Sequence, residues 1–147
     1  MSHPFKKLHH FCLVVDDLGK AVAYFESLGV TGWQDYPPLS DYTEVSLSRE
    51  DFETLAYKYV NLDGVQLQLC HPAPGATPQR RYLESHGPGV YHLGFGVADV
   101  DAAEQDGLAH ELEIRGRGRR ADGTGFTYFE TEAELGVTLE VRSPDRL

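Results

Sequence analysis

Cysteine is scarce in this sequence, with only Cys12 and Cys70 among 147 residues. Two cysteines exclude the disulfide framework that stabilises many small secreted proteins. The chain also lacks an apolar run near the roughly 20 residues of a membrane span, and residues 1–7 contain no apolar secretory core. These absences predict a cytoplasmic globular protein, and the chain is long enough to form a hydrophobic core.

Positive charge is also in short supply. The 13 lysines and arginines face 23 aspartates and glutamates, so the formal net charge is -10 at pH 7. Such a charge disfavours binding to nucleic acid or to an anionic membrane. The exception is the arginine- and glycine-rich stretch 115–120, which we interpret as a loop after a short strand over 112–115. It either lies in solvent or meets a phosphate or carboxylate group of a substrate.

Two phrases of the sequence occur twice. The phrase around His10 returns around His92, and with the same shift Asp17 falls on Asp99. Residues 64–72 match residues 136–144 with a shorter shift. An internal repeat of this kind indicates two equivalent structural units. Because the two shifts are unequal, one unit has the longer interior.

Each unit is predicted to form a strand, a helix and three further strands. In the first unit, the helix begins after Asp17 and the strands cover residues 8–15, 31–36, 54–61 and 65–70. In the second, Asp99 or Asp101 caps the helix and the strands cover residues 91–97, 112–115, 126–131 and 137–142. Residues 39–53 show no clear pattern, so we expect a loop or a short helix over a cleft.

The predicted fold class is α+β, with a single domain over residues 1–147. Two βαβββ modules, about 8–72 and 90–144, are joined by a connector over 73–89. The connector is rich in proline and glycine, and Thr77 followed by Pro78 is typical of an N-cap and a first helical residue. A short helix is therefore expected within the connector.

The repeated phrases bring chemically useful side chains to equivalent positions. His10 and His92 come from the first strands of the two modules, and Gln68 and Glu140 from their last strands. If the modules pack as equals about an approximate twofold axis, these four side chains converge on one point. Imidazole, amide and carboxylate ligands suit a six-coordinate first-row divalent metal, and two histidines with one carboxylate match non-haem iron oxygenases. His9 is predicted to point to the opposite face.

At these residues the chain resembles the vicinal oxygen chelate superfamily. This superfamily includes glyoxalase I, methylmalonyl-CoA epimerase, extradiol dioxygenases and bleomycin- or fosfomycin-resistance proteins. The resemblance covers essentially residues 8–144 and is strongest to the epimerase branch, through 68–72, Thr77-Pro78, Tyr82-Leu83 and 89–93. It implies a curved, partly closed mixed sheet around a metal-binding cleft. The implied ligands of a divalent cation (Co, Mn, Ni, Zn or Fe) are His10, Gln68, His92 and Glu140.

The resemblance also implies an activity. We expect a metal-dependent isomerase or lyase of the glyoxalase or epimerase type, with an enolate-like intermediate of a small carbonyl or thioester substrate. Glu140 would be a ligand and also the base. The epimerases place a glutamate base on the third strand of the first module, where residues 54–60 of this chain contain no acid. Superfamily sheets often pair, which implies a homodimer.

Two other functions stay open. An Fe(II)-dependent ring-cleaving dioxygenase would use the two histidines and Glu140 to hold iron. A non-catalytic small-molecule-binding or antibiotic-resistance protein would rely on aromatic surface, which Trp33, eight tyrosines and seven phenylalanines provide.

Overall fold

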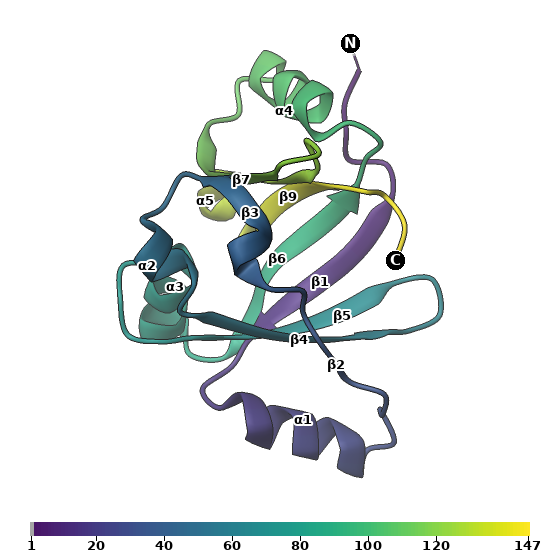
Figure 1. Cartoon of the computed structure of the whole chain (residues 1–147), viewed down its shortest axis with the longest axis vertical. Coiled ribbons are helices and arrows are strands. Elements are labelled where there is room, and N and C mark those ends of the chain that lie inside the picture. Colours follow the sequence, from purple (N-terminus) through teal and green to yellow (C-terminus); the bar gives the residue numbers. More distant parts are fainter. Residues whose placement is uncertain (1) are drawn as a thin grey trace.

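A nine-stranded mixed sheet forms the body of the molecule and curls into a half-barrel (Figure 1). The structure is a computed structural model and describes residues 2–147. The strands are β1 (Leu8–Val14), β2 (Gln34–Asp35), β3 (Tyr42–Val45), β4 (Leu55–Asn61), β5 (Gln66–Pro72), β6 (Gly89–Gly96), β7 (Ile114–Arg120), β8 (Gly125–Phe129) and β9 (Thr138–Ser143). Their order in the sheet is β2-β4-β5-β1-β6-β9-β8-β7-β3.

Five α-helices and one 3-10 helix accompany the sheet in the described part of the chain. They are α1 (Leu18–Ser27), η1 (Leu39–Asp41), α2 (Arg49–Phe52), α3 (Pro78–His86), α4 (Val100–Ala109) and α5 (Glu132–Leu135). Helix α4 packs on β8 and β9, whereas α1 lies against β4 and β5. Within residues 2–147, no helix combines the length and the apolar character that a membrane crossing requires.

The predicted helix starts are confirmed. The side chain of Asp17 accepts a hydrogen bond from the backbone N–H of Lys20, and the side chain of Thr77 caps α3 directly before Pro78. Of the two candidates for α4, Asp99 is the N-cap. These side chains satisfy backbone donors that the first helical turn leaves without partners.

The sheet is symmetric about its central pair of strands. β1 and β6 pair antiparallel, β5 pairs parallel with β1, and β9 pairs parallel with β6. On either side of this pair the order is the same, β1-β5-β4-β2 and β6-β9-β8-β7. The predicted α+β fold class with a curved mixed sheet is confirmed.

The first half has more residues between its two repeated phrases than the second half has, and these additional residues wrap across the molecule. β2 lies at one edge of the sheet and β3 at the other, next to β7. Residues 36–41 connect these two edges, so this segment crosses the open side of the half-barrel. The expected strand over 31–36 shrinks to β2, and the unassigned stretch 39–53 contains η1, β3 and α2.

The basic stretch 115–120 is a strand, not the predicted loop. It forms most of β7, which pairs with β8 on one side and with β3 on the other. Three of its arginines are bound by acids: Arg115 by Glu130 and Glu132, and Arg117 and Arg119 by Asp101 and Glu104. The sequence concealed this because the acids lie far away along the chain, on α4 and after β8.

Candidate metal centre

Four adjacent strands, β5, β1, β6 and β9, carry the predicted ligands across the middle of the sheet. Strand pairing arranges the inward residues in two rows. One row is Gln66, His10, Gly94 and Glu140, and the other is Gln68, Cys12, His92 and Thr138. When the second row is taken in reverse order, each of its residues is the repeat equivalent of the residue at the same place in the first row. This is the approximate twofold relationship that the repeat predicted.

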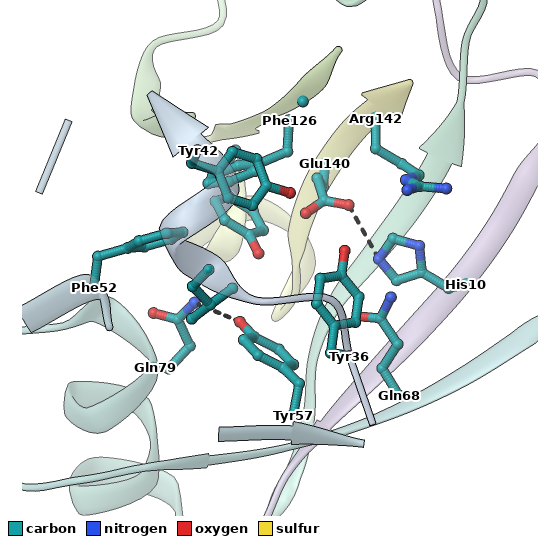
Figure 2. Close-up of a pocket in the computed structure, with 13 residues that line it drawn as sticks. His10, Tyr36, Tyr42, Phe52, Tyr57, Gln68, Gln79, Phe126, Glu140 and Arg142 are labelled. Carbon is teal, nitrogen blue, oxygen red and sulfur yellow. Dashed lines mark hydrogen bonds and ion pairs between the residues drawn. The ribbon is translucent and has the colours of Figure 1, made fainter. Parts of the chain in front are cut away.

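The structure brings His10, His92 and Glu140 into contact. The Nε2 atoms of the two histidines lie 2.9 Å apart, and Nε2 of His10 lies 3.0 Å from Oε1 of Glu140 (Figure 2). The distance from Nε2 of His92 to Oε2 of Glu140 is 3.8 Å. All three residues are at most 4% exposed. Three donor atoms therefore converge inside the protein.

Burial sets the charge of this cluster. Removal from water, with Arg142 nearby, lowers the pKa of His10 to about 3, and burial lowers the pKa of His92 to about 3. Both imidazoles are therefore neutral at pH 7. Burial raises the pKa of Glu140 above its ordinary value, against the nearby positive groups that lower it.

This donor set fits a divalent metal. Two neutral ring nitrogens face each other, and Oε1 of Glu140 is buried without a hydrogen-bond partner although it lies close to His10. A cation between these atoms would use lone pairs that are otherwise opposed or unsatisfied. The three residues form a group with metal-binding geometry, their ligand atoms all within 4.8 Å of one another.

Gln68 lies beside this cluster and lines the same pocket. Its Nε2 donates to Oε1 of Gln66 at 2.8 Å, and Nε2 of Gln66 donates to Oδ1 of Asn61 at 3.0 Å. This chain of amides occupies the nitrogen of Gln68 and leaves its oxygen available to the site. Gln68 as a fourth ligand stays a prediction.

Glycine at position 94 makes room for His10. Gly94 pairs with His10 across β1 and β6, and a Cβ atom there would overlap the imidazole ring. The ring can therefore lie over the backbone of β6 and reach Glu140 on β9. Cys12 holds the equivalent place in the other row and is fully buried.

His9 does not point to the opposite face, as predicted, but lies next to His10. The pairing of β1 with β6 shifts between Leu8 and His10, so His9 is an extra residue in the ladder. Such a bulge turns neighbouring side chains toward the same side. The Nδ1 atoms of His9 and His10 are 2.8 Å apart, and His9 is 1% exposed.

Aromatic side chains surround three of the candidate ligands, His10, Gln68 and Glu140, in a pocket (Figure 2). It is lined by His10, Tyr36, Leu39, Tyr42, Phe52, Tyr57, Gln68, Gln79, Gly125, Phe126, Tyr128, Glu140 and Arg142. Burial raises the pKa of the Tyr128 hydroxyl well above its ordinary value, so this hydroxyl stays protonated at pH 7. Oε1 of Gln79 is buried without a partner. No pattern in the sequence indicated this pocket wall, because its residues come from many separate elements.

Glu140 is the one carboxylate among these lining residues of the described chain. Glu44 lies exposed on β3 and Glu53 lies exposed after α2, so neither replaces the glutamate base expected from the epimerases. Lys58 binds Asp35 at 2.6 Å. Cys12 and Cys70 are free and buried, and burial raises the pKa of Cys70 to about 12, so its thiol is neutral at pH 7.

Comparison with known proteins agrees with this geometry. The family model described as the glyoxalase/bleomycin resistance protein/dioxygenase superfamily matches residues 9–128. The chain belongs to this superfamily. The resemblance inferred from the repeated phrases is thus confirmed, and the members of this superfamily with similar sequence or structure include methylmalonyl-CoA epimerases.

Three relatives illustrate the degree of similarity within the superfamily. The mitochondrial methylmalonyl-CoA epimerase of Homo sapiens is 23% identical over 121 residues, which cover 77% of this chain and 62% of the human protein. The chain thus matches less than two thirds of that relative. The methylmalonyl-CoA epimerase of Mycobacterium tuberculosis superposes with a TM-score of 0.69 at 18% identity, covering 97% of this chain and 90% of that one.

A Streptomyces coelicolor methylmalonyl-CoA epimerase variant in complex with 2-nitronate-propionyl-CoA has a TM-score of 0.67 at 23% identity. The match covers 94% of this chain and 96% of that chain. At these identities, the structural similarity establishes the shared fold.

Proposed function

We propose that this protein is a metal-dependent isomerase that moves a proton on the carbon next to the carbonyl of a small carbonyl or thioester compound. The convergence of His10, His92 and Glu140 carries this proposal, because His10 and Glu140 also line an aromatic pocket. Membership of the glyoxalase superfamily and similarity to methylmalonyl-CoA epimerases support it.

His10, His92 and Glu140 would hold the metal, with the amide oxygen of Gln68 as a fourth ligand. A bound divalent metal supplies Lewis-acid polarisation of a carbonyl, which lowers the free energy of the negative charge that develops on its oxygen. The residues of the pocket then have two tasks, to orient the substrate and to move the proton.

Glu140 is the group that we assign to proton transfer. It is the one carboxylate that lines the pocket within the described residues, so it is the base next to a carbonyl held at the metal centre. Tyr42 and Tyr57 also line the pocket, and burial raises the pKa of both well above the ordinary value. These hydroxyls therefore stay protonated and act as hydrogen-bond donors.

A single carboxylate restricts the reaction. Inversion at carbon by two bases needs groups on both faces of the substrate, whereas one base takes a proton and returns it along one face. Within the described residues, Glu140 is the only carboxylate that lines the pocket. We therefore favour an isomerisation that shifts a proton between neighbouring atoms over the two-base inversion of an epimerase.

The ligand set also favours a second candidate. Two histidines and one carboxylate form the facial set that holds Fe(II) in ring-cleaving dioxygenases. Oxygen uptake by the Fe(II)-loaded protein with a panel of catechols would support this candidate, and its absence would leave the isomerase.

Metal content is the first measurement. Protein purified without a histidine tag and incubated with Mn, Co, Ni, Zn or Fe(II) should hold about one divalent ion per chain. A His92→Ala/Glu140→Ala variant should lose it. His86→Ala is a matched control, because His86 is exposed and stacks on Tyr82 away from the pocket. A wild-type protein that stays metal-free would overturn the proposal in favour of a metal-free binding protein.

Activity is then tested by proton exchange. Loaded protein is incubated in heavy water with small ketones, 2-oxo acids and thioesters, including methylmalonyl-CoA, and NMR follows loss of the proton next to the carbonyl. Exchange that disappears in Glu140→Gln supports the assigned base. Inversion of methylmalonyl-CoA at an undiminished rate in that variant would contradict it.

A further inference from the structure

A second hollow lies beside the metal pocket and shares Tyr36 and Arg142 with it. It has a volume of about 160 Å³. We name it the arginine groove, and it is lined by Tyr36, Pro37, Tyr59, Gln66, Arg120, Arg142, Pro144, Arg146 and Leu147. Three of these nine residues are arginines, in a chain whose net charge is -10.

The arginines of the groove are not bound by acids. Within residues 2–147, Arg120, Arg142 and Arg146 have no carboxylate oxygen within 4.0 Å, in contrast to the ion-paired arginines of β7. The nearby acids are engaged elsewhere: Asp145 by Lys7 at 3.6 Å, and Asp122 by the hydroxyl of Thr124 at 2.7 Å.

Neighbouring groups hold two of these guanidinium groups in place. Nη2 of Arg120 donates to the hydroxyl of Tyr42 at 2.8 Å, and its guanidinium carbon lies 4.3 Å from the centre of the Tyr42 ring. Nη1 of Arg142 donates to the backbone oxygen of Arg146 at 3.4 Å. Ordered guanidinium groups bind carboxylate or phosphate with less loss of side-chain entropy than mobile ones do.

We propose that the arginine groove binds a carboxylate or phosphate group of the substrate whose carbonyl lies at the metal centre. This rests on the proposed function and narrows its substrate to an anionic compound. Guanidinium groups match both anions with paired hydrogen bonds. Of the stretch 115–120, Arg120 alone takes the role suggested from the sequence, because alternation along β7 turns it away from its acid-bound neighbours.

The position of Arg142 limits the distance between the two parts of the substrate. Arg142 follows Glu140 by two residues on β9, and both line the metal pocket (Figure 2). Their Cα atoms are therefore about 7 Å apart. An anionic group in the groove sits a few bonds from the reacting carbonyl, so it belongs to the small reacting compound or acyl group. The nucleotide phosphates of coenzyme A, at the far end of the pantetheine arm, would lie beyond the groove.

Anion binding to metal-free protein tests the proposal. Inorganic phosphate and glutarate are titrated into EDTA-treated protein, dialysed free of EDTA, and followed by isothermal titration calorimetry and by the arginine Nε–H signals in NMR. Arg120→Gln and Arg146→Gln should each weaken binding of at least one anion about tenfold. Arg81→Gln is the matched control, because Arg81 is exposed on α3, has no ion pair within the described residues and lies outside the groove.

Equal weakening in the Arg81 variant would show general surface attraction and overturn the proposal, as would binding that no substitution changes or no binding at all. Arg146 is exposed, so its substitution does not threaten folding. Coenzyme A is titrated in parallel. If Arg120→Gln and Arg146→Gln lose coenzyme A binding, the groove binds the coenzyme and not the reacting part of the substrate, which would overturn the proposal. These titrations need neither metal nor turnover. A protein that binds anions in the groove but binds no metal would therefore refute the proposed function and leave the anion site in place.

Discussion

The Nδ1 atoms of His9 and His10 lie 2.8 Å apart, directly behind the predicted metal centre. Nε2 of His9 lies 3.0 Å from the backbone oxygen of Arg146. If His9 donates from Nε2 to that oxygen, its Nδ1 accepts the proton of His10 Nδ1, and His10 Nε2 keeps a free lone pair. Arg142, near the same Nε2, favours the opposite arrangement. A metal on His10 would select the first arrangement, so we predict that His9 is a positioning residue.

Substitution of His9 should therefore change metal affinity. His9→Leu removes the acceptor for His10 Nδ1 and should weaken zinc binding about 10- to 100-fold. His9→Asn keeps an oxygen near the position of Nδ1 and should restore most of the affinity. Competition with a chromogenic chelator measures the dissociation constants, and nitrogen-15 NMR of the zinc-loaded protein reports the tautomer of His10. Equal affinities for the Leu variant and the wild type would rule out the positioning role.

Gly94 should tolerate no side chain. Alanine at this position places a Cβ atom inside the space of the His10 ring, so the ring must move away from Glu140. We expect Gly94→Ala to lose metal binding and about 1–3 kcal/mol of unfolding free energy. Gly19→Ala in α1 is the control, since its Cβ meets only Asp17 Oδ1 at 3.6 Å. Metal retained at wild-type affinity by Gly94→Ala would contradict the proposed role of the glycine.

The metal-free protein should lose stability in acid. The pKa values of His10 and His92 are about 3 and that of His9 is about 4 in the folded state, against 6.5 when unfolded. Below pH 6.5 the unfolded chain binds protons that the folded chain does not, so the stability is full above about 6.5 and falls as pH decreases toward 4. Glu140 acts in the opposite direction, because its raised pKa lets the folded state take up one proton.

Urea unfolding of EDTA-treated protein between pH 7.5 and 4.5 measures this dependence. Removal of one buried histidine, as in His92→Gln, should reduce its slope by up to about 1.4 kcal/mol per pH unit. Bound metal should stabilise the protein at pH 7, and this gain should vanish in the same acidic range because protons compete for the ligands. Stability that is flat from pH 7.5 to 4.5 would show that the histidines are not buried as described.

The acids that bind β7 should matter for stability. Oε1 of Glu104 accepts hydrogen bonds from Arg117, Arg119 and Thr127 at 2.8, 3.1 and 2.7 Å, and Arg119 is 5% exposed. Glu104→Ala leaves this arginine buried with one acid fewer, which should cost about 3–5 kcal/mol. Glu84→Ala, which breaks an exposed pair with Arg80, should cost at most about 0.5 kcal/mol. Thermal unfolding compares the two, and similar losses would refute the distinction.

The sequence by itself determined the repeat and, through it, the placement of the predicted ligands. His10 and His92 occupy equivalent positions in duplicated phrases, as do Gln68 and Glu140, and alternation along a strand fixes which side chains share a face. Helix starts at Asp17 and Thr77 were equally readable, because capping depends on neighbouring residues.

Tertiary structure alone decided the rest, because it depends on residues that are distant in the chain. An extra residue in the β1–β6 ladder turned His9 toward His10. Acids on α4 bind arginines of the basic stretch, which forms strand β7 and not the loop that the sequence indicated. The crossing of residues 36–41 added Tyr36 to the pocket, and the pairing of β7 with β3 placed Arg120 beside Tyr42. Alternation along a strand predicts which face of the sheet a side chain occupies. The distant residues that it contacts are determined only when the strands pair and the sheet curls.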